Sequence, residues 1–248
     1  MKKILLSLIV SLASNCLFSQ SANEIVSTCF EAMGGKNWEK IRGINYSYNV
    51  LEVEENVTVS WKYIQMRDGR VSYNLNVMDN EIKGGFDGEI YWTSNTITNR
   101  IEIGDWLSTE KYKRNSKDFP NSLFCAENLG YKIELAGEDS LNGISYLCIS
   151  LEKKELTQDA REVDNIEIYY IDKVSKFLTY TFSKILFGPN NGKILVTKYS
   201  DYRKIDDVYF AFTKSVGFLE AGLNTITTYD KIEINPKVSD DAFKLPKK

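Results

Sequence analysis

Apolar and polar residues alternate along this chain with a helical period near its start and a strand period thereafter. Between Ala22 and Met33 the apolar residues recur at helical spacing, which predicts one amphipathic helix: Ile25, Val26, Cys29, Phe30 and Met33. The Gly34-Gly35 pair ends this helix, since glycine adopts the left-handed conformation of a helix C-terminus without strain. From Ile44 onward the period is two, which is typical of a strand with one apolar and one polar face.

Two of the predicted strands form a hairpin across Asp68-Gly69, a dipeptide typical of tight turns. The apolar members of the alternation are Val57, Val59, Trp61 and Tyr63 before the turn and Val71, Tyr73, Leu75 and Val77 after it. The two apolar rows are therefore expected to lie beside each other on the same face of the sheet.

The strand pattern is interrupted between Ser108 and Gly130. Pro120 stands at a helix start and Gly130 at a helix stop, so one or two short helices are expected between the two halves of the sheet. The whole pattern predicts a mainly β fold, an antiparallel curved half-barrel of about eleven strands with covering helices. A cavity is expected between those helices and the apolar concave face.

The first residues carry the pattern of a secretory signal peptide. Two lysines precede an almost wholly apolar run from Ile4 to Phe18, and Ser19 and Ser21 occupy the −3 and −1 positions of a cleavage site. The apolar run is too short to cross a bilayer as a helix. We therefore expect residues 1–21 to be removed. Residues 22–248 are then expected to form one exported domain, in the periplasm or at the periplasmic face of the outer membrane.

Lipidation at Cys16 is the alternative processing of this leader. The residues before it, Ala13-Ser14-Asn15, match a lipid-attachment box poorly, because a small residue should precede the cysteine. We therefore expect cleavage close to Ala22 without acylation. An oxidising compartment would allow one disulfide among the three later cysteines, but their apolar settings favour small buried side chains: Cys29, Cys125 and Cys148.

Charge and residue chemistry exclude several classes of function. Removal of the leader takes away two lysines and no acid, so the net charge falls from −3 to about −5, and no basic stripe remains for nucleic acid. The chain has no histidine, which removes the commonest general base and every triad or metal site that needs imidazole. We therefore expect no enzymatic activity, no metal site and no cofactor. The densest acidic pairs fall in turns or in the tail: Asp87 with Glu89, Asp206 with Asp207, and Asp240 with Asp241.

Aromatic residues make up 12% of the chain, and many of them fall on the predicted strand faces. They fill an ordinary core under one interpretation, and under the other they line a cavity for an acyl chain or another apolar ligand. The candidate ligand-binding residues of that cavity are Phe30 of the first helix and seven strand residues, namely Val57, Val59, Trp61, Tyr63, Tyr73, Leu75 and Trp92. The Phe30 side of the helix is expected to lie over the two apolar rows.

Five groups of residues occur in an order that resembles a known family. They are Ala32-Met33-Gly34-Gly35 with Trp38 and Ile41; Phe86-Asp87-Gly88-Glu89 with Trp92; Leu135-Ala136-Gly137-Glu138 with Asn142-Gly143; Tyr199-Ser200-Asp201-Tyr202-Arg203 with Asp206-Asp207-Val208; and Ile232 to Pro236 with Asp240 to Pro246. Together they are similar to exported Bacteroidetes proteins described as outer-membrane lipoprotein-sorting proteins, which resemble LolA, LolB and LppX. The chain departs from that pattern in having Asp207 where the family often has glycine, and in the long, charged segment from Lys153 to Asp164.

The resemblance implies an antiparallel half-barrel closed by helices, with an apolar cavity able to take acyl chains. The function it implies is that of a periplasmic or outer-membrane-associated binding protein, which holds or carries lipid or the acyl chains of lipoproteins. The expected partners are lipid or lipidated protein cargo and outer-membrane components, and the protein is expected to be a monomer. The alternative is a non-catalytic structural or interaction module of the cell envelope with a filled core.

Overall fold

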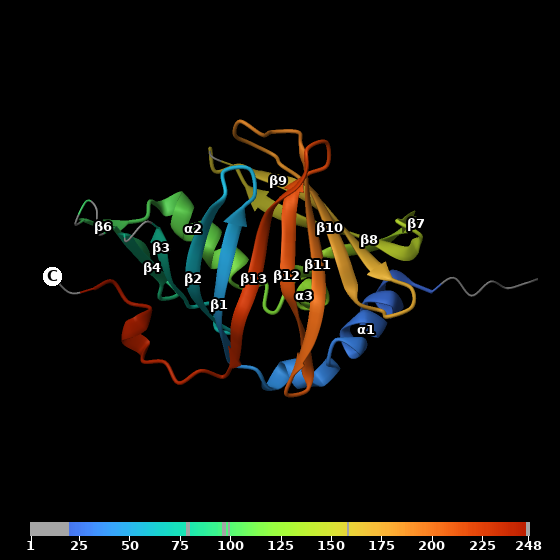
Figure 1. Ribbon diagram of the computed structural model, residues 1–248, viewed down its shortest axis with the longest axis horizontal. Helices are drawn as coiled ribbons and strands as arrows, with labels where there is room; N and C mark the ends of the chain where they lie inside the picture. Colours follow the sequence, from blue (N-terminus) through green and yellow to red (C-terminus); the bar gives the residue numbers. More distant parts are fainter. Residues whose placement is uncertain (1–19, 78–79, 96–97, 99, 158, 247–248) are drawn as a thin grey trace, which may run out of the picture.

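The fold is built on one antiparallel sheet whose two edge strands, β6 and β7, do not pair with each other (Figure 1). The structure is a computed structural model that describes residues 20–77, 80–95, 98, 100–157 and 159–246. In those ranges thirteen strands pair in the order β6-β5-β4-β3-β2-β1-β13-β12-β11-β10-β9-β8-β7. Their bounds are β1 Gly43–Glu52, β2 Val57–Met66, β3 Val71–Val77, β4 Asn80–Phe86, β5 Tyr91–Asn95, β6 Arg100–Ile103, β7 Lys132–Leu141, β8 Ile144–Leu156, β9 Glu162–Asp172, β10 Leu178–Lys184, β11 Ile194–Ile205, β12 Val208–Phe218 and β13 Gly222–Ile234.

Three α-helices and two short 3-10 helices accompany the sheet in the same part of the chain. They are α1 Ala22–Ala32, η1 Gly35–Lys40, α2 Trp106–Asn115, α3 Ser122–Leu129 and η2 Asp240–Ala242. None of these described helices is long and apolar enough to cross a membrane. Cys16 and the predicted signal peptide, apart from its last two residues, lie outside the described residues.

The predicted fold class is confirmed: the protein is mainly β, with an open, curved antiparallel sheet and a few covering helices. The sheet has thirteen strands in the described residues rather than about eleven. Two of the strands at one edge, β5 and β6, contain only five and four residues.

The topology explains why helices cover one face. Strands β1 to β6 proceed outward to one edge of the sheet, and β7 begins at the opposite edge. The connection between β6 and β7 must therefore cross the sheet, and α2 and α3 form that crossing behind the strands in the view of Figure 1. Strands β8 to β13 then lead back to the middle, where β13 pairs with β1.

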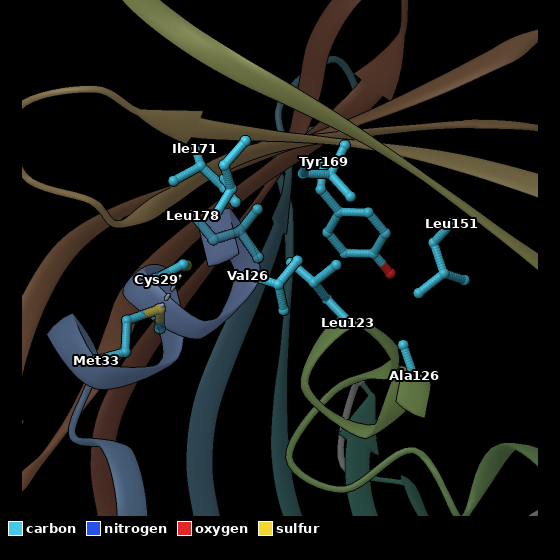
Figure 2. Packing of buried hydrophobic residues seen from close by; sticks show 11 residues of the cluster. Val26, Cys29, Met33, Leu123, Ala126, Leu151, Tyr169, Ile171 and Leu178 are labelled. Atoms are coloured by element: carbon cyan, nitrogen blue, oxygen red, sulfur yellow. Dashed lines mark hydrogen bonds between the residues drawn. The ribbon is translucent and has the colours of Figure 1, made fainter. Parts of the chain in front are cut away.

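Helix α1 forms as the periodicity predicts and begins with a capping box. The Ser21 hydroxyl accepts a hydrogen bond from the Glu24 amide, and the Glu24 carboxylate accepts one from the Ser21 amide. Its apolar stripe packs on the half of the sheet that contains β8, β9 and β10, with α3 beside it (Figure 2). The buried members of this cluster are Ile25, Val26, Cys29, Met33, Leu123, Ala126, Ile149, Leu151, Tyr169, Ile171 and Leu178.

The end of α1 is fixed against the turn between β11 and β12. Gly34 has a positive φ of 124°, and a Cβ there would lie 2.7 Å from the carbonyl oxygen of Asp207, so only glycine permits this approach. The Met33 carbonyl accepts hydrogen bonds from the Trp38 indole and from the Tyr209 amide, both at 3.0 Å. Two of the sequence groups noted above, at residues 32–41 and 199–208, therefore meet at one end of the sheet.

The three cysteines are buried and unpaired, as their apolar settings predict: Cys29, Cys125 and Cys148. Burial raises the pKa of the Cys29 thiol to about 12. This thiol is therefore protonated at neutral pH and serves as a small apolar side chain in the core.

Candidate ligand-binding cavity

The strand register brings the predicted apolar rows together on one face. Tyr46 of β1 pairs with Tyr63 of β2, which in turn pairs with Tyr73 of β3. In the same way Trp61 pairs with Leu75. Directly opposed residues of neighbouring strands point to the same side of a sheet. The prediction that the two rows lie side by side is therefore correct, and β1 adds a third row to them.

Six rings on this face form a continuous surface, which we call the aromatic floor: Tyr46, Tyr48, Trp61, Tyr63, Tyr73 and Tyr229. The ring centroids of Tyr48 and Trp61 lie 6.0 Å apart and are nearly parallel, while those of Trp61 and Tyr73 lie 6.1 Å apart. Tyr229 of β13 lies 5.6 Å from Tyr46 and 5.2 Å from Tyr48. The floor thus spans four neighbouring strands, from β13 to β3.

Gly84 of β4 makes room for one end of this floor. A Cβ at this position would lie 2.2 Å from the ring carbon Cζ of Tyr73, so the missing side chain lets the ring lie across the strand. The Tyr73 hydroxyl reaches that of Tyr91 on β5 at 2.9 Å. The Gly84-Gly85 pair is therefore needed for space on the sheet rather than for a turn.

Helix α2 covers the floor at its β3 to β5 end. Tyr112 of α2 stacks on Tyr91, with ring centroids 4.3 Å apart and an angle of 14°. The rest of α2 is loosely packed: none of its residues is fully buried, and Trp106 is 63% exposed. A hollow of about 530 Å³ lies between α2 and the sheet, lined by Tyr63, Gln65 and Val71 on the sheet side. This volume is within the usual range for ligand pockets.

A second hollow, of about 320 Å³, lies on the same face under the α2–α3 connection. Tyr46 and Tyr229 of the aromatic floor line it, together with Tyr199 of β11. Its polar end contains Asp118 and Glu167, which both lie close to Lys153, with Nζ to oxygen distances of 3.3 and 3.2 Å. Hydroxyl groups also bond these carboxylates: Ser122 and Tyr131 donate to Asp118, and Tyr169 donates to Glu167.

Lys214 of β12 lines this second hollow at a distance from that network. Its Nζ lies 5.4 Å from the ring centroid of Tyr229 and 5.8 Å from that of Tyr199, within the range of a cation–π contact. Burial opposes the charge, whereas Tyr229 and Tyr199 favour it, and on balance the pKa of Lys214 is raised. The side chain is therefore an ammonium at neutral pH.

Four tyrosines of the floor remain neutral over the same range. Burial raises the pKa of Tyr63 to about 12 and also raises the pKa values of Tyr46, Tyr48 and Tyr73. The charge of Lys214 lowers the pKa values of Tyr46 and Tyr63 by a smaller amount, so the ammonium is close enough to act on both rings. The floor therefore offers neutral rings and hydroxyl groups at neutral pH.

Six of the eight predicted cavity residues lie together on this face, and all six are half-buried: Val57, Val59, Trp61, Tyr63, Tyr73 and Leu75. Phe30 does not lie over them. It packs edge-on against Phe124 of α3, with centroids 5.2 Å apart, because α1 covers the other half of the sheet. Helix α2, rather than α1, lies over the β3 to β5 end of the aromatic floor.

Trp92 lies on the opposite face and does not line the cavity. It pairs with Gly85, one residue out of phase with the row that contains Gly84. Its indole donates a hydrogen bond of 2.8 Å to the carbonyl of Phe243 in the C-terminal segment, which covers it to 4% exposure. Arg70 fixes the same segment through an ion pair of 2.6 Å with Asp240. Trp92 therefore does not share the face of the other predicted strand residues, which corrects its expected place in the cavity.

The acidic pairs noted in the sequence serve local structure. One Asp87 carboxylate oxygen accepts hydrogen bonds from the amides of Glu89 and Ile90, which shapes the turn between β4 and β5. Asp206 has a positive φ of 50° in the turn between β11 and β12. Among the described residues, no group of three His, Cys, Asp or Glu side chains is arranged to hold a metal ion.

Sequence reasoning did not include Tyr46, Tyr48, Tyr229 or Lys214 in the site. The sequence does contain a signal that points to Lys214. It continues the alternation of Phe210 and Phe212 on β12, so a cation occupies a position where the pattern calls for an apolar residue. The alternation does not itself show that this row faces the same hollow as β1 and β2.

The arrangement defines a class of protein: an open antiparallel sheet whose helix-covered concave face carries aromatic hollows. No family model matches the chain, and no curated protein matches it. The chain is similar in fold to several solved structures, of which three are described. For a DUF1329 family protein from Desulfovibrio piger ATCC 29098, the TM-score is 0.59 at 12% identity, covering 91% of this chain and 98% of that one.

A LolA superfamily protein from Nitrosomonas europaea gives a TM-score of 0.54 at 9% identity, covering 92% of this chain and 99% of that chain. A putative outer membrane lipoprotein-sorting protein domain from Vibrio parahaemolyticus gives 0.53 at 9% identity, covering 89% and 94%. At these identities the likeness is one of fold, and the fold is LolA-like. The Bacteroidetes origin suggested by the sequence groups stays a prediction.

Proposed function

We propose that this protein is a non-catalytic binding protein of the bacterial cell envelope, which holds or carries an acyl chain along its aromatic floor. The chain would belong to a lipid or to a lipidated protein. Export to the periplasm, or to the periplasmic face of the outer membrane, follows from the signal peptide predicted at residues 1–21. The absence of histidine from the chain agrees with a function that needs no general base.

The observation that carries this proposal is the incomplete burial of the floor. Trp61, Tyr73 and Leu75 stand in neighbouring strands on the concave face, yet all three are half-buried. A structural module with a filled core would bury them fully, as the protein does with Ile149 and Leu151 under α1. A long apolar surface left half-covered beside two hollows is typical of a ligand site.

The energy that holds the apolar chain would come from its burial. Each methylene group withdrawn from water contributes about 0.8 kcal/mol, so a long acyl chain on the floor is held firmly without covalent chemistry. Loading and release need a cover that moves. Helix α2 suits this role, because its main ring contacts with the sheet are those of Tyr112 with Tyr91 and Phe86, and it buries no residue completely.

The name of one neighbour in fold supports this proposal. The Vibrio parahaemolyticus domain is described as a putative outer membrane lipoprotein-sorting protein domain. A lipidated protein presents acyl chains, which is the chemistry that the aromatic floor accommodates. The fold likeness and the half-buried floor therefore point to one ligand class from independent directions.

Titration of delipidated protein with an environment-sensitive fluorescent fatty acid tests the proposal. The parent should bind the probe saturably, and Leu75→Gln should weaken binding about tenfold, because a buried amide without a partner costs about 1–3 kcal/mol. Ile64→Gln is the matched control: Ile64 is half-buried on β2, one residue out of phase with Tyr63 and therefore on the outer face. That control should leave probe affinity unchanged.

The filled-core alternative makes the reverse prediction. The parent would take up no probe and carry no co-purified lipid in native mass spectrometry, and Leu75→Gln would lower the melting temperature strongly. Reproducible turnover of ester, glycoside or phosphate substrates, abolished by Asp87→Asn or Asp206→Asn, would contradict the non-catalytic part of the proposal.

A further inference from the structure

Lys214 is the unusual group of the concave face. It follows Phe210 and Phe212 at alternate positions of β12, and its direct cross-strand partners are Tyr199 on β11 and Thr227 on β13, neither of which is a carboxylic acid. Its Nζ lies 5.4 Å from the ring of Tyr229 and 5.8 Å from that of Tyr199. A cation therefore projects into an otherwise aromatic part of the hollow.

No carboxylate neutralises this cation within the described residues. The two acids that line the same hollow, Asp118 and Glu167, are both within 3.3 Å of the ammonium of Lys153. They also accept hydrogen bonds from Ser122 and Tyr169, respectively. Lys214 itself forms no ion pair with any described residue, and a buried charge without a counter-ion is costly.

Tyrosine side chains share the hollow with Lys214: Tyr46, Tyr199 and Tyr229 all line it. Tyr46 lines the same hollow as Lys214 and pairs with Tyr63, which lines the hollow under α2, so these two residues join the two hollows. Neither of their hydroxyls forms a hydrogen bond with another described residue. Both are protonated at neutral pH and are therefore free to donate to an anion.

We infer that Lys214 anchors the carboxylate of a long-chain amphiphile whose apolar chain lies along the aromatic floor. This inference rests on the proposed function and names the head group of its ligand. One ammonium with phenol donors suits a single negative charge. A dianionic phosphate would instead meet the net negative charge of Asp118, Glu167 and Lys153 at the other end of the same hollow.

The geometry gives the direction of the chain. From β12 to β3 the sheet crosses β13, β1 and β2, which is about 19 Å at the usual spacing of 4.7–4.9 Å between strands. A chain that starts at Lys214 and runs over Tyr46 and Tyr63 therefore ends in the hollow under α2. The carboxylate stays beside the ammonium, and the methyl end lies beneath the loosely packed helix.

The test compares palmitate with methyl palmitate, which have the same chain and differ in head-group charge. Displacement of the fluorescent fatty acid from the mature protein gives the affinity for each ligand. Lys214→Met should weaken palmitate binding at least tenfold and leave methyl palmitate unchanged, since hydrogen bonds to charged groups are worth about 1.5–3 kcal/mol, or roughly 10- to 150-fold. Lys214→Arg keeps the charge and should retain most of the affinity for palmitate.

Lys198→Met is the matched control. Lys198 lies on β11 and is also half-buried over a tyrosine ring, with its Nζ 5.9 Å from the centroid of Tyr180. It pairs with Ser215, one residue out of phase with Lys214, and so faces the outer side of the sheet. Its replacement should change neither affinity. Thermal melts show whether each variant is folded, and Lys214→Met should melt no lower than the parent, because it removes an unpaired charge.

The possible results distinguish a failure of the Lys214–carboxylate contact, called the anchor below, from a failure of the proposed function. If the parent binds palmitate and methyl palmitate equally, or if Lys214→Met weakens both to the same extent, the anchor is contradicted while the acyl site stands. If hexadecyl phosphate binds more tightly than palmitate and depends on Lys214, the head group is a phosphate and the carboxylate assignment is wrong. If the parent binds none of these amphiphiles, the proposed function fails and the anchor fails with it.

Discussion

Replacement of Lys153 by methionine should destabilise the protein strongly, because this ammonium neutralises two buried carboxylates. Its Nζ lies 3.3 Å from Asp118 and 3.2 Å from Glu167, and the three side chains are 15%, 13% and 18% exposed. Asp118 belongs to the α2–α3 connection, whereas Lys153 and Glu167 belong to β8 and β9. The ion pairs therefore fasten the helical crossing to the sheet.

The size of the effect follows from this burial. Removing one partner of a buried pair costs about 3–5 kcal/mol, because the remaining charge stays in a poorly solvated site. Methionine preserves the aliphatic stem of lysine, so little packing is lost. For a chain of 150–250 residues, 1 kcal/mol corresponds to about 2–4 °C in the unfolding midpoint, so a fall of roughly 6–20 °C is expected.

Lys154→Met provides the control on the next residue of β8. Lys154 pairs with Asp164 on the outer face, and these two side chains are 59% and 53% exposed. Exposed pairs contribute about 0–1 kcal/mol, so this variant should stay close to the parent. Urea unfolding of all three proteins at neutral pH measures the difference. A loss below about 1 kcal/mol for Lys153→Met, or equal losses for both variants, would show that Lys153 does not neutralise two poorly solvated carboxylates.

Two further predictions concern the aromatic residues. Burial raises the pKa of Tyr63 to about 12, above the value near 10 of an unfolded phenol, so its contribution to stability is complete below about pH 10 and is lost between about pH 10 and 12. Tyr63→Phe should remove up to about 1.4 kcal/mol per pH unit of this alkaline decline, and equal slopes in urea unfolding of parent and variant would contradict it. Trp92→Phe should cost about 1–3 kcal/mol, because the carbonyl of Phe243 loses its buried donor, yet leave probe affinity unchanged. Weaker probe binding by a folded Trp92→Phe protein would show that Trp92 contributes to ligand binding.

Local pattern predicts the parts of this fold that depend on neighbouring residues. The period of the first helix and the alternation across Asp68-Gly69 are both confirmed, and the register that pairs Tyr63 with Tyr73 follows from them. The interior helices are also found close to their expected place, with Asn121 capping α3 and Gly130 ending it in a left-handed conformation.

The local pattern does not predict features that depend on residues far apart in the sequence. The helix over the floor is α2 because the chain must cross from β6 to β7, and this follows from the order of all thirteen described strands. The face of Trp92 depends on a C-terminal segment 151 residues away. The same holds for Lys214. Its alternation with Phe210 and Phe212 predicts that the three side chains share one face of β12, but it does not predict which other strands line the hollow on that face.

Photo-cross-linking tests most directly whether an acyl chain lies on the aromatic floor. A fatty acid with a diazirine near its methyl end is bound to the delipidated protein and irradiated, and the labelled peptides are identified by mass spectrometry. Labels that palmitate displaces are expected on the concave residues of β1, β2 and β3 and on α2. Labels confined to the outer face, around Tyr170 and Tyr180, or no label that palmitate displaces, would contradict the central claim.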